Sequence, residues 1–143
     1  MKSMVGIALL SAAVVAISLA PSPLLAQACQ DEEIMVEDYR KSITDLVETV
    51  KKESLQDFER AFHQKNCLTK LTLSVNFVNG LVTCLEKAAQ DSMATKPQVE
   101  AYKAKREKYS RLKVTIEQDR DALKAATTGK EAKTRIEKFV FAD

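Results

Sequence analysis

Apolar side chains recur every three or four residues through most of this chain, which is the spacing of one face of an α-helix. From Asp31 to Lys52 the repeating apolar positions are Met35, Tyr39, Ile43, Leu46 and Val50. The stripe then changes phase near Ser54, which with Asp57 has the spacing of a helix start. The new stripe contains Leu55, Phe58 and Phe62. The pattern predicts helices over about 32–52 and 55–66, with a kink or break near Glu53–Ser54.

The segment 68–90 fits two structures. Residues 71–77 alternate between apolar and polar and lead into Asn79-Gly80, a strong β-hairpin signal. The segment also carries an unbroken heptad stripe, formed by Leu68, Leu71, Val75, Val78, Val82, Leu85 and Ala89. A helix sorts every residue into one wide apolar arc and one polar arc, whereas a hairpin leaves the apolar pairs after Gly80 unsorted. We predict a central helix, although Gly80 costs it about 1 kcal/mol relative to alanine, and keep a hairpin over 71–85 as the alternative.

A long polar helix is predicted from 96 to about 126. It begins with a capping box of Thr95 and Gln98, in which each side chain bonds the other residue's backbone. Lys105 and Asp119 interrupt its thin apolar stripe, which contains Val99, Tyr102, Tyr109, Leu112, Ile116 and Leu123. Glu107 and Arg111 have the spacing of a favourable ion pair on this helix.

A last helix is predicted over about 129–141. Thr128 and Glu131 repeat the capping-box pattern. We expect this helix to return Ile136, Phe139 and Val140 to the core, although Phe139-Val140-Phe141 could instead form a recognition tail. Together the segments predict an all-α fold, a small bundle of four to five helices with one long, charged and partly exposed helix. The composition agrees, because 3 Gly and 3 Pro in 143 residues are too few for the turns of an all-β fold.

The N-terminus has the pattern of a secretory signal peptide. Lys2 is followed by the uncharged apolar run Val5–Ala20, by Pro21 and Pro23, and by the small residues of Ala26-Gln27-Ala28. The sequence therefore predicts cleavage after Ala28, so that residues 1–28 are removed and 29–143 form one domain in the periplasm or outside the cell. A retained membrane anchor is the alternative, but a core of about 16 residues is short for a bilayer span of roughly 20.

The residue after the predicted cut is Cys29, which raises a second alternative. Bacterial lipoproteins begin with an acylated cysteine, and a lipidated Cys29 would make the protein a lipid-anchored envelope component. The preceding residues fit poorly, because Ala26 and Gln27 stand where such a signal has Leu and a small residue.

Three cysteines in an exported chain predict one disulfide and one leftover thiol. On one straight helix, Cys67 and Cys84 would lie about 25 Å apart, far beyond disulfide reach. A bond between them requires a chain reversal; otherwise Cys29 pairs with one of them, or no intrachain bond forms.

Charge is unevenly distributed along the expected mature chain. Residues 29–95 contain 8 Lys and Arg against 12 Asp and Glu, and residues 96–143 contain 13 against 8. The basic excess is typical of a patch for nucleic acid, anionic lipid or an acidic partner or, more simply, of a solvated helix face balanced by the acidic half. We predict no nucleic-acid binding and take as the candidate binding face five residues of the long helix: Lys103, Arg106, Lys108, Arg111 and Lys113.

Residues for catalysis are scarce. A single His excludes three-His zinc sites, and no metal or cofactor site is predicted. Glu59, His63 and Cys67 share a helical face at i, i+4 and i+8, so that an imidazole could activate the thiol. An exposed His beside a structural Cys explains the same spacing.

The sequence therefore predicts an exported, non-enzymatic helical protein that acts by protein binding, like an adaptor or chaperone, with self-association as one form of that binding. Small periplasmic helical chaperones and adaptors share this design, although no motif in the chain identifies it as a member of such a family. The alternatives are a thiol-dependent or redox protein that uses Cys67 with His63, and the lipid-anchored component.

Overall fold

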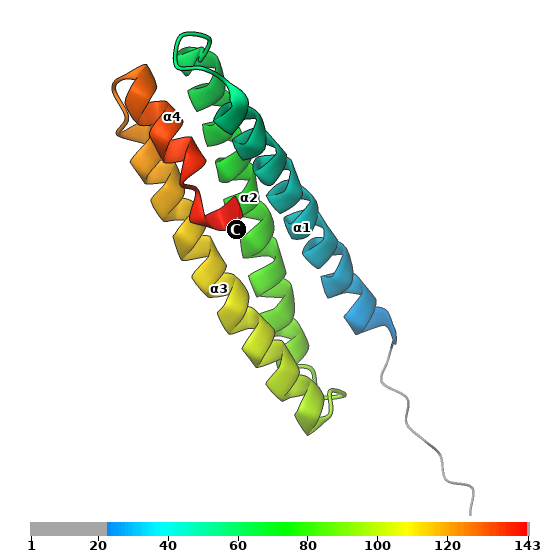
Figure 1. The fold of residues 1–143 in the computed structure, drawn as a ribbon. Coiled ribbons are helices and arrows are strands. Elements are labelled where there is room, and N and C mark those ends of the chain that lie inside the picture. Colours follow the sequence, from blue (N-terminus) through cyan, green and yellow to red (C-terminus); the bar gives the residue numbers. More distant parts are fainter. Residues whose placement is uncertain (1–22, 143) are drawn as a thin grey trace, which may run out of the picture.

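The computed structural model describes the backbone of residues 23–142 and the side chains of residues 29–141. These residues form helices and no strand: α1 (Pro23–Lys52), α2 (Arg60–Ala89), α3 (Lys96–Lys124), α4 (Gly129–Glu137) and the short 3-10 helix η1 (Val140–Ala142). α1, α2 and α3 run up, down and up beside one another, and α4 lies at the end of the bundle where α1 ends (Figure 1). The predicted all-α bundle is confirmed.

α2 is the centre of this bundle. Both α1 and α3 pack along α2, whereas α1 and α3 make no close backbone contact with each other. At one end α4 and η1 contact both α1 and α3 and fill the space between them (Figure 1). α4 and η1 therefore lie over this side of the bundle at the end where α1 ends.

The helical prediction for residues 71–85 is confirmed and the hairpin alternative is wrong, because α2 continues through Asn79-Gly80 without a break. Its buried residues recur at intervals of three and four, apart from the adjacent pair Ser74 and Val75: His63, Cys67, Leu71, Ser74, Val75, Val78, Leu81, Leu85 and Ala88. Leu68, Val82 and Ala89 of the expected stripe are only half-buried. The most buried line is rotated toward Leu81 and Ala88 because α2 has a packed helix on each side.

The predicted start of a second helix near residue 55 is wrong. Ser54 Oγ does accept a hydrogen bond from the Asp57 amide at 3.2 Å, so the expected start signal forms. It closes one turn only, because Glu59 has an extended backbone and α2 begins at Arg60. The predicted helices 55–66 and 68–90 are one helix, since no helix-breaking residue separates them, and the predicted break at Glu53–Ser54 is confirmed.

α1 begins at Pro23, earlier than the sequence pattern predicts, and its apolar stripe is rotated by about one residue. The structure buries Cys29, Val36, Ile43, Val47 and Val50. Of the expected stripe, Met35 is 42% exposed, and Tyr39 and Leu46 are half-buried beside α2. The predicted signal peptide lies outside the described residues up to position 22, and its last residues 23–28 are described only as helical backbone.

α3 begins at the predicted capping box. The Thr95 amide donates to Gln98 Oε1 at 2.8 Å, and the helix ends at Lys124, slightly before the expected residue 126. Tyr109, Ile116 and Leu123 are buried, with Tyr102 and Leu112 packed beside them. The two polar interruptions of this stripe make contacts of their own: Lys105 Nζ lies 2.8 Å from Glu33 Oε2, and Asp119 Oδ2 accepts the Phe141 amide at 3.1 Å.

α4 also begins at its predicted capping box, because Thr128 Oγ1 accepts from the Glu131 amide at 3.2 Å. The expected helix over 129–141 is shorter, however, and ends at Glu137 before η1. Ile136 and Phe139 reach the core as predicted, but Val140 is 63% exposed, and Phe141 is buried in its place. The change from α to 3-10 geometry alters which residues share a face.

Candidate binding surface and thiol sites

One disulfide joins Cys29 of α1 to Cys84 of α2. Their Cα atoms are 5.7 Å apart, the bond spans 55 residues of sequence, and Cys67 is a free, buried thiol. Cys67 and Cys84 lie on the same continuous helix, so a bond between them is excluded as the sequence argument required. The disulfide ties the start of the described side chains to the central helix.

This bond bears on the lipid-anchor alternative. An acylated N-terminal cysteine carries its lipid on the sulfur, and the Cys29 sulfur is bonded to Cys84. The same sulfur cannot hold both groups. Cys29 is also 95% buried, since only 5% of it is exposed, which fits a structural cystine.

The expected face of Glu59, His63 and Cys67 does not form. Glu59 caps α2 in an extended conformation outside the helix, and its exposed side chain is not part of the core. His63 Nε2 lies instead 2.9 Å from Glu53 Oε2, and the His63 ring stacks on Phe58 with centroids 4.9 Å apart. Neither partner was expected, because Glu53 lay at the predicted break and Phe58 was assigned to the stripe of a helix over 55–66, whereas both lie in the 53–59 connection.

The environment of Cys67 opposes a nucleophilic role. Burial raises the pKa of the Cys67 thiol from 9.0 to about 12, and the nearby charge of Lys70 lowers it only in part. A reactive cysteine needs a thiolate near neutral pH and access for its substrate. Cys67 is 2% exposed and protonated, so its position is that of a core residue.

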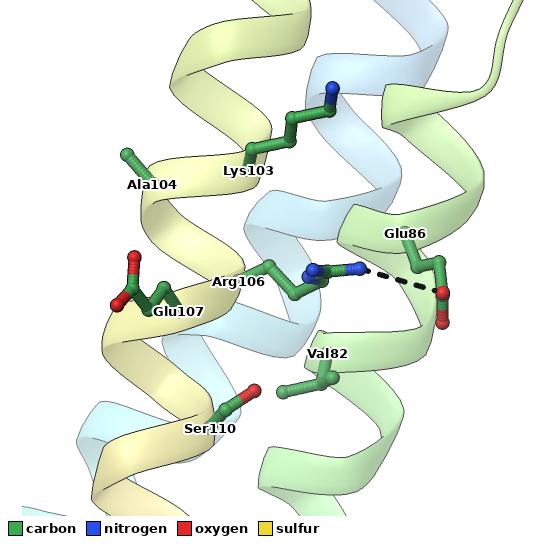
Figure 2. Close-up of a pocket in the computed structure, with 7 residues that line it drawn as sticks. All are labelled: Val82, Glu86, Lys103, Ala104, Arg106, Glu107 and Ser110. Atoms are coloured by element: carbon green, nitrogen blue, oxygen red, sulfur yellow. Dashed lines mark ion pairs between the residues drawn. The ribbon is translucent and has the colours of Figure 1, made fainter.

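The five residues of the candidate binding face do not share one face of α3. Lys103 and Arg106 point toward the groove with α2, where Arg106 Nη1 lies 3.5 Å from Glu86 Oε1 (Figure 2). Arg111 pairs with Glu107 as predicted, and Lys113 Nζ lies 3.9 Å from Glu117. Lys108 is placed over the Tyr109 ring, 5.0 Å from its centroid. In the part of the chain that the structure describes, Lys103 and Lys108 have no ion-pair partner.

A groove of about 640 Å³ lies between α2 and α3 at this level. Its walls are Val82, Glu86, Lys103, Ala104, Arg106, Glu107 and Ser110, and Figure 2 shows the ion pair of Arg106 and Glu86 spanning it. The groove is open and shallow, and besides Glu86, Arg106 and Glu107, which form ion pairs, it offers the Lys103 ammonium, the Ser110 hydroxyl and two small apolar side chains. Such a surface can hold a carboxylate-bearing segment of another protein, but it does not enclose a small molecule.

A polar cluster between α1 and α3 was not expected from the sequence. Tyr109 Oη donates to Glu33 Oε1 at 2.7 Å, and Lys105 binds the other carboxylate oxygen. Although burial alone would raise the pKa of Glu33, the hydrogen bonds from Lys105 and Tyr109 lower it below its usual value. Burial and the bond to Glu33 raise the pKa of Tyr109. The only sequence signal was that Lys105 occupied an apolar position of the stripe.

No group of three or more metal-binding side chains is found among the described residues. α2 has the length and apolar composition of a helix that could cross a membrane, but core helices of water-soluble bundles meet the same criteria. Searches against protein-family models, curated proteins and solved structures each return no match for this chain.

Proposed function

We propose that this chain is an exported, non-enzymatic helical protein that acts by binding an acidic segment of a partner protein, as an adaptor or chaperone does. The observation that carries the proposal is the exposed exterior of α3. Only three side chains of this 29-residue helix are buried, so most of its charges face water. The groove beside Lys103 is a hollow in that exterior whose walls come from both α2 and α3.

The placement of acidic residues near Cys29 supports export. Asp31, Glu32 and Glu33 lie well inside a helix that begins at Pro23, and its first turn contains no acidic residue. Cleavage after Ala28 would bring these carboxylates into the first turn, where they stabilise a helix through its dipole. The Cys29–Cys84 disulfide is also of the kind that persists in oxidising compartments.

Intact-mass measurement of the accumulated protein, with and without reduction, tests export. We expect a chain that begins at Cys29, carries no acyl group and gains the mass of two hydrogens on reduction. An acylated Cys29, or a chain that keeps residues 1–28, would contradict this part of the proposal.

Charge reversal tests the binding surface. Lys103→Glu with Arg106→Glu should weaken salt-sensitive recovery of a partner from the exporting compartment by at least about tenfold, because like charges would then face the acidic segment. Lys65→Glu with Lys124→Glu is the matched control, with the same change in net charge and both lysines exposed elsewhere. Equal loss in both variants, or no partner captured by the wild-type chain, would refute the proposed surface.

A further inference from the structure

A basic ridge lies on the outer side of α4 and η1. It consists of three exposed cations that form no ion pair among the described residues, with one exposed apolar side chain beside them: Lys130, Arg135, Lys138 and Val140. The exposed Glu131 lies on the same side of α4, but its carboxylate accepts hydrogen bonds from the backbone of Thr127 and Thr128. The ridge is held rigidly, because Lys133 Nζ donates to the Val50 carbonyl of α1 at 2.8 Å and the Phe141 amide donates to Asp119 of α3. The backbone that carries the three cations and Val140 is therefore anchored to α1 and α3, while the cationic side chains extend into solvent.

An acidic groove lies on the other half of α1, beyond the part that α4 covers. It is a shallow, open hollow of about 370 Å³ on the surface of α1, and its lining residues all belong to that helix: Gln30, Glu33, Ile34, Glu37 and Asp38. Glu33 is already bonded to Lys105 and Tyr109. The ion pair of Glu37 with Arg40 is long, at 4.0 Å, and Asp38 has no ion pair in the described structure. Ile34 is 51% exposed at the centre of these carboxylates.

The ridge and the groove complement each other in charge, and each has one exposed aliphatic side chain. The two surfaces cannot meet within one molecule. The groove lies at Ile34 of α1, whereas α4 is anchored to α1 at Val50, and about 24 Å of helix separates these two residues. In a two-fold symmetric pair, the ridge of each copy meets the groove of the other, so one arrangement forms both contacts at once. Each copy therefore carries both complementary surfaces, the basic ridge and the acidic groove.

We propose that this protein forms a two-fold dimer in which the basic ridge of one copy docks into the acidic groove of a second copy. Val140 lies against Ile34 at the centre of each contact, and Arg135 and Lys138 lie against Glu37 and Asp38. α4 of one copy then covers the part of α1 that its own α4 leaves open. The contact uses neither Lys103 nor Arg106, so it stands or falls separately from the partner surface on α3.

Sedimentation velocity of the disulfide-bonded protein over a concentration series tests the dimer. We expect a monomer–dimer equilibrium at low salt that shifts toward monomer at high salt, because screening weakens contacts between exposed charges. Arg135→Glu with Lys138→Glu should raise the dimer Kd at least about tenfold, and Glu37→Lys with Asp38→Lys should do the same. The chain that combines all four reversals should recover dimerisation, since the complementary charges are restored with opposite signs.

Lys65→Glu with Lys87→Glu is the control, because both lysines are exposed on α2 away from the contact. Circular dichroism confirms that each variant stays folded. A wild-type chain that remains monomeric at every concentration would overturn the proposal and leave the groove to a different basic protein. The proposal would also be overturned if the ridge and groove variants still form the dimer, or if the variant with all four reversals does not recover it.

Discussion

Cys67 provides the first prediction at the scale of single residues. Its thiol is buried and its pKa is raised to about 12, so it should resist alkylation by iodoacetamide at pH 8 in the folded chain and react readily in denaturant. The unfolded thiol ionises near 9.0, whereas the folded one stays neutral to about 12. Between these pH values the folded state keeps a proton that the unfolded state has lost, so a rise in pH favours unfolding. The free energy of unfolding should therefore fall as pH rises from 9 toward 12. Fast labelling of native Cys67 would contradict the assigned burial.

Tyr109 and Glu33 provide the second prediction. Tyr109→Phe removes the 2.7 Å hydrogen bond to the Glu33 carboxylate and should lower the free energy of unfolding by about 1–2 kcal/mol in urea titrations. The same change in a Glu33→Gln background should cost less, because the charged acceptor is gone. The pKa of Glu33 is lowered in the folded state, so its contribution is present above pH 4.5 and is lost as pH falls through the folded pKa. If Tyr109→Phe lowers the free energy of unfolding equally in both backgrounds, the Tyr109 hydroxyl does not stabilise the fold through the Glu33 carboxylate.

At the scale of elements, Gly80 distinguishes the helix from the hairpin directly. A Cβ added at Gly80 meets no atom within 4 Å, and no glycine among the described residues has a positive φ. Gly80→Ala should therefore stabilise the protein by about 1 kcal/mol, which is the difference between the two residues in a helix interior. In an Asn-Gly hairpin turn the same substitution would destabilise, because the turn needs a positive φ at this position. A raised urea midpoint with an unchanged slope supports the helix.

The elements also show how far the sequence could predict the fold. Periodicity predicts that each main segment is helical. Thr95 and Thr128 predict where α3 and α4 begin, because a capping box is a local signal. Ser54 has the same signal but starts no helix, since the path of the connection to α2 decides whether the turn continues. The one-residue rotation of the α1 stripe, which exposes Met35 and buries Val36, depends on where neighbouring helices lie, and no local pattern contains that information.

At the scale of the whole molecule, the Cys29–Cys84 bond should be a main source of stability. It spans 55 residues, and closing a loop of that length in the unfolded chain contributes about 2–4 kcal/mol. Cys29→Ala with Cys84→Ala should lower the free energy of unfolding by this amount, measured by urea titration. Dithiothreitol should destabilise the wild type similarly and leave the double variant unchanged. A reductant effect that persists in the variant would point to a different bond.

The candidate sites show where sequence reasoning stopped. Spacing alone placed Cys67 out of reach of Cys84 on a helix. Only the packing of α1 on α2 selects Cys29 as the partner of Cys84. The pairing of His63 with Glu53 depends on an irregular connection, and periodicity says nothing about such segments. The basic residues of α3 were found from composition, whereas their division between a groove, surface ion pairs and the Tyr109 ring required the three-dimensional arrangement.

The two ends of the domain share a property that matters for its lifetime. At one end Cys29 is covalently fixed to α2, and at the other Phe141 is buried and hydrogen-bonded to Asp119. Degradation machines and exopeptidases start on a loose chain end, and most domains supply one. In this domain the chain at Cys29 and at Phe141 is bonded to the bundle instead. Unravelling of the described domain from either of these positions is therefore limited by opening of the bundle or by reduction of its cystine.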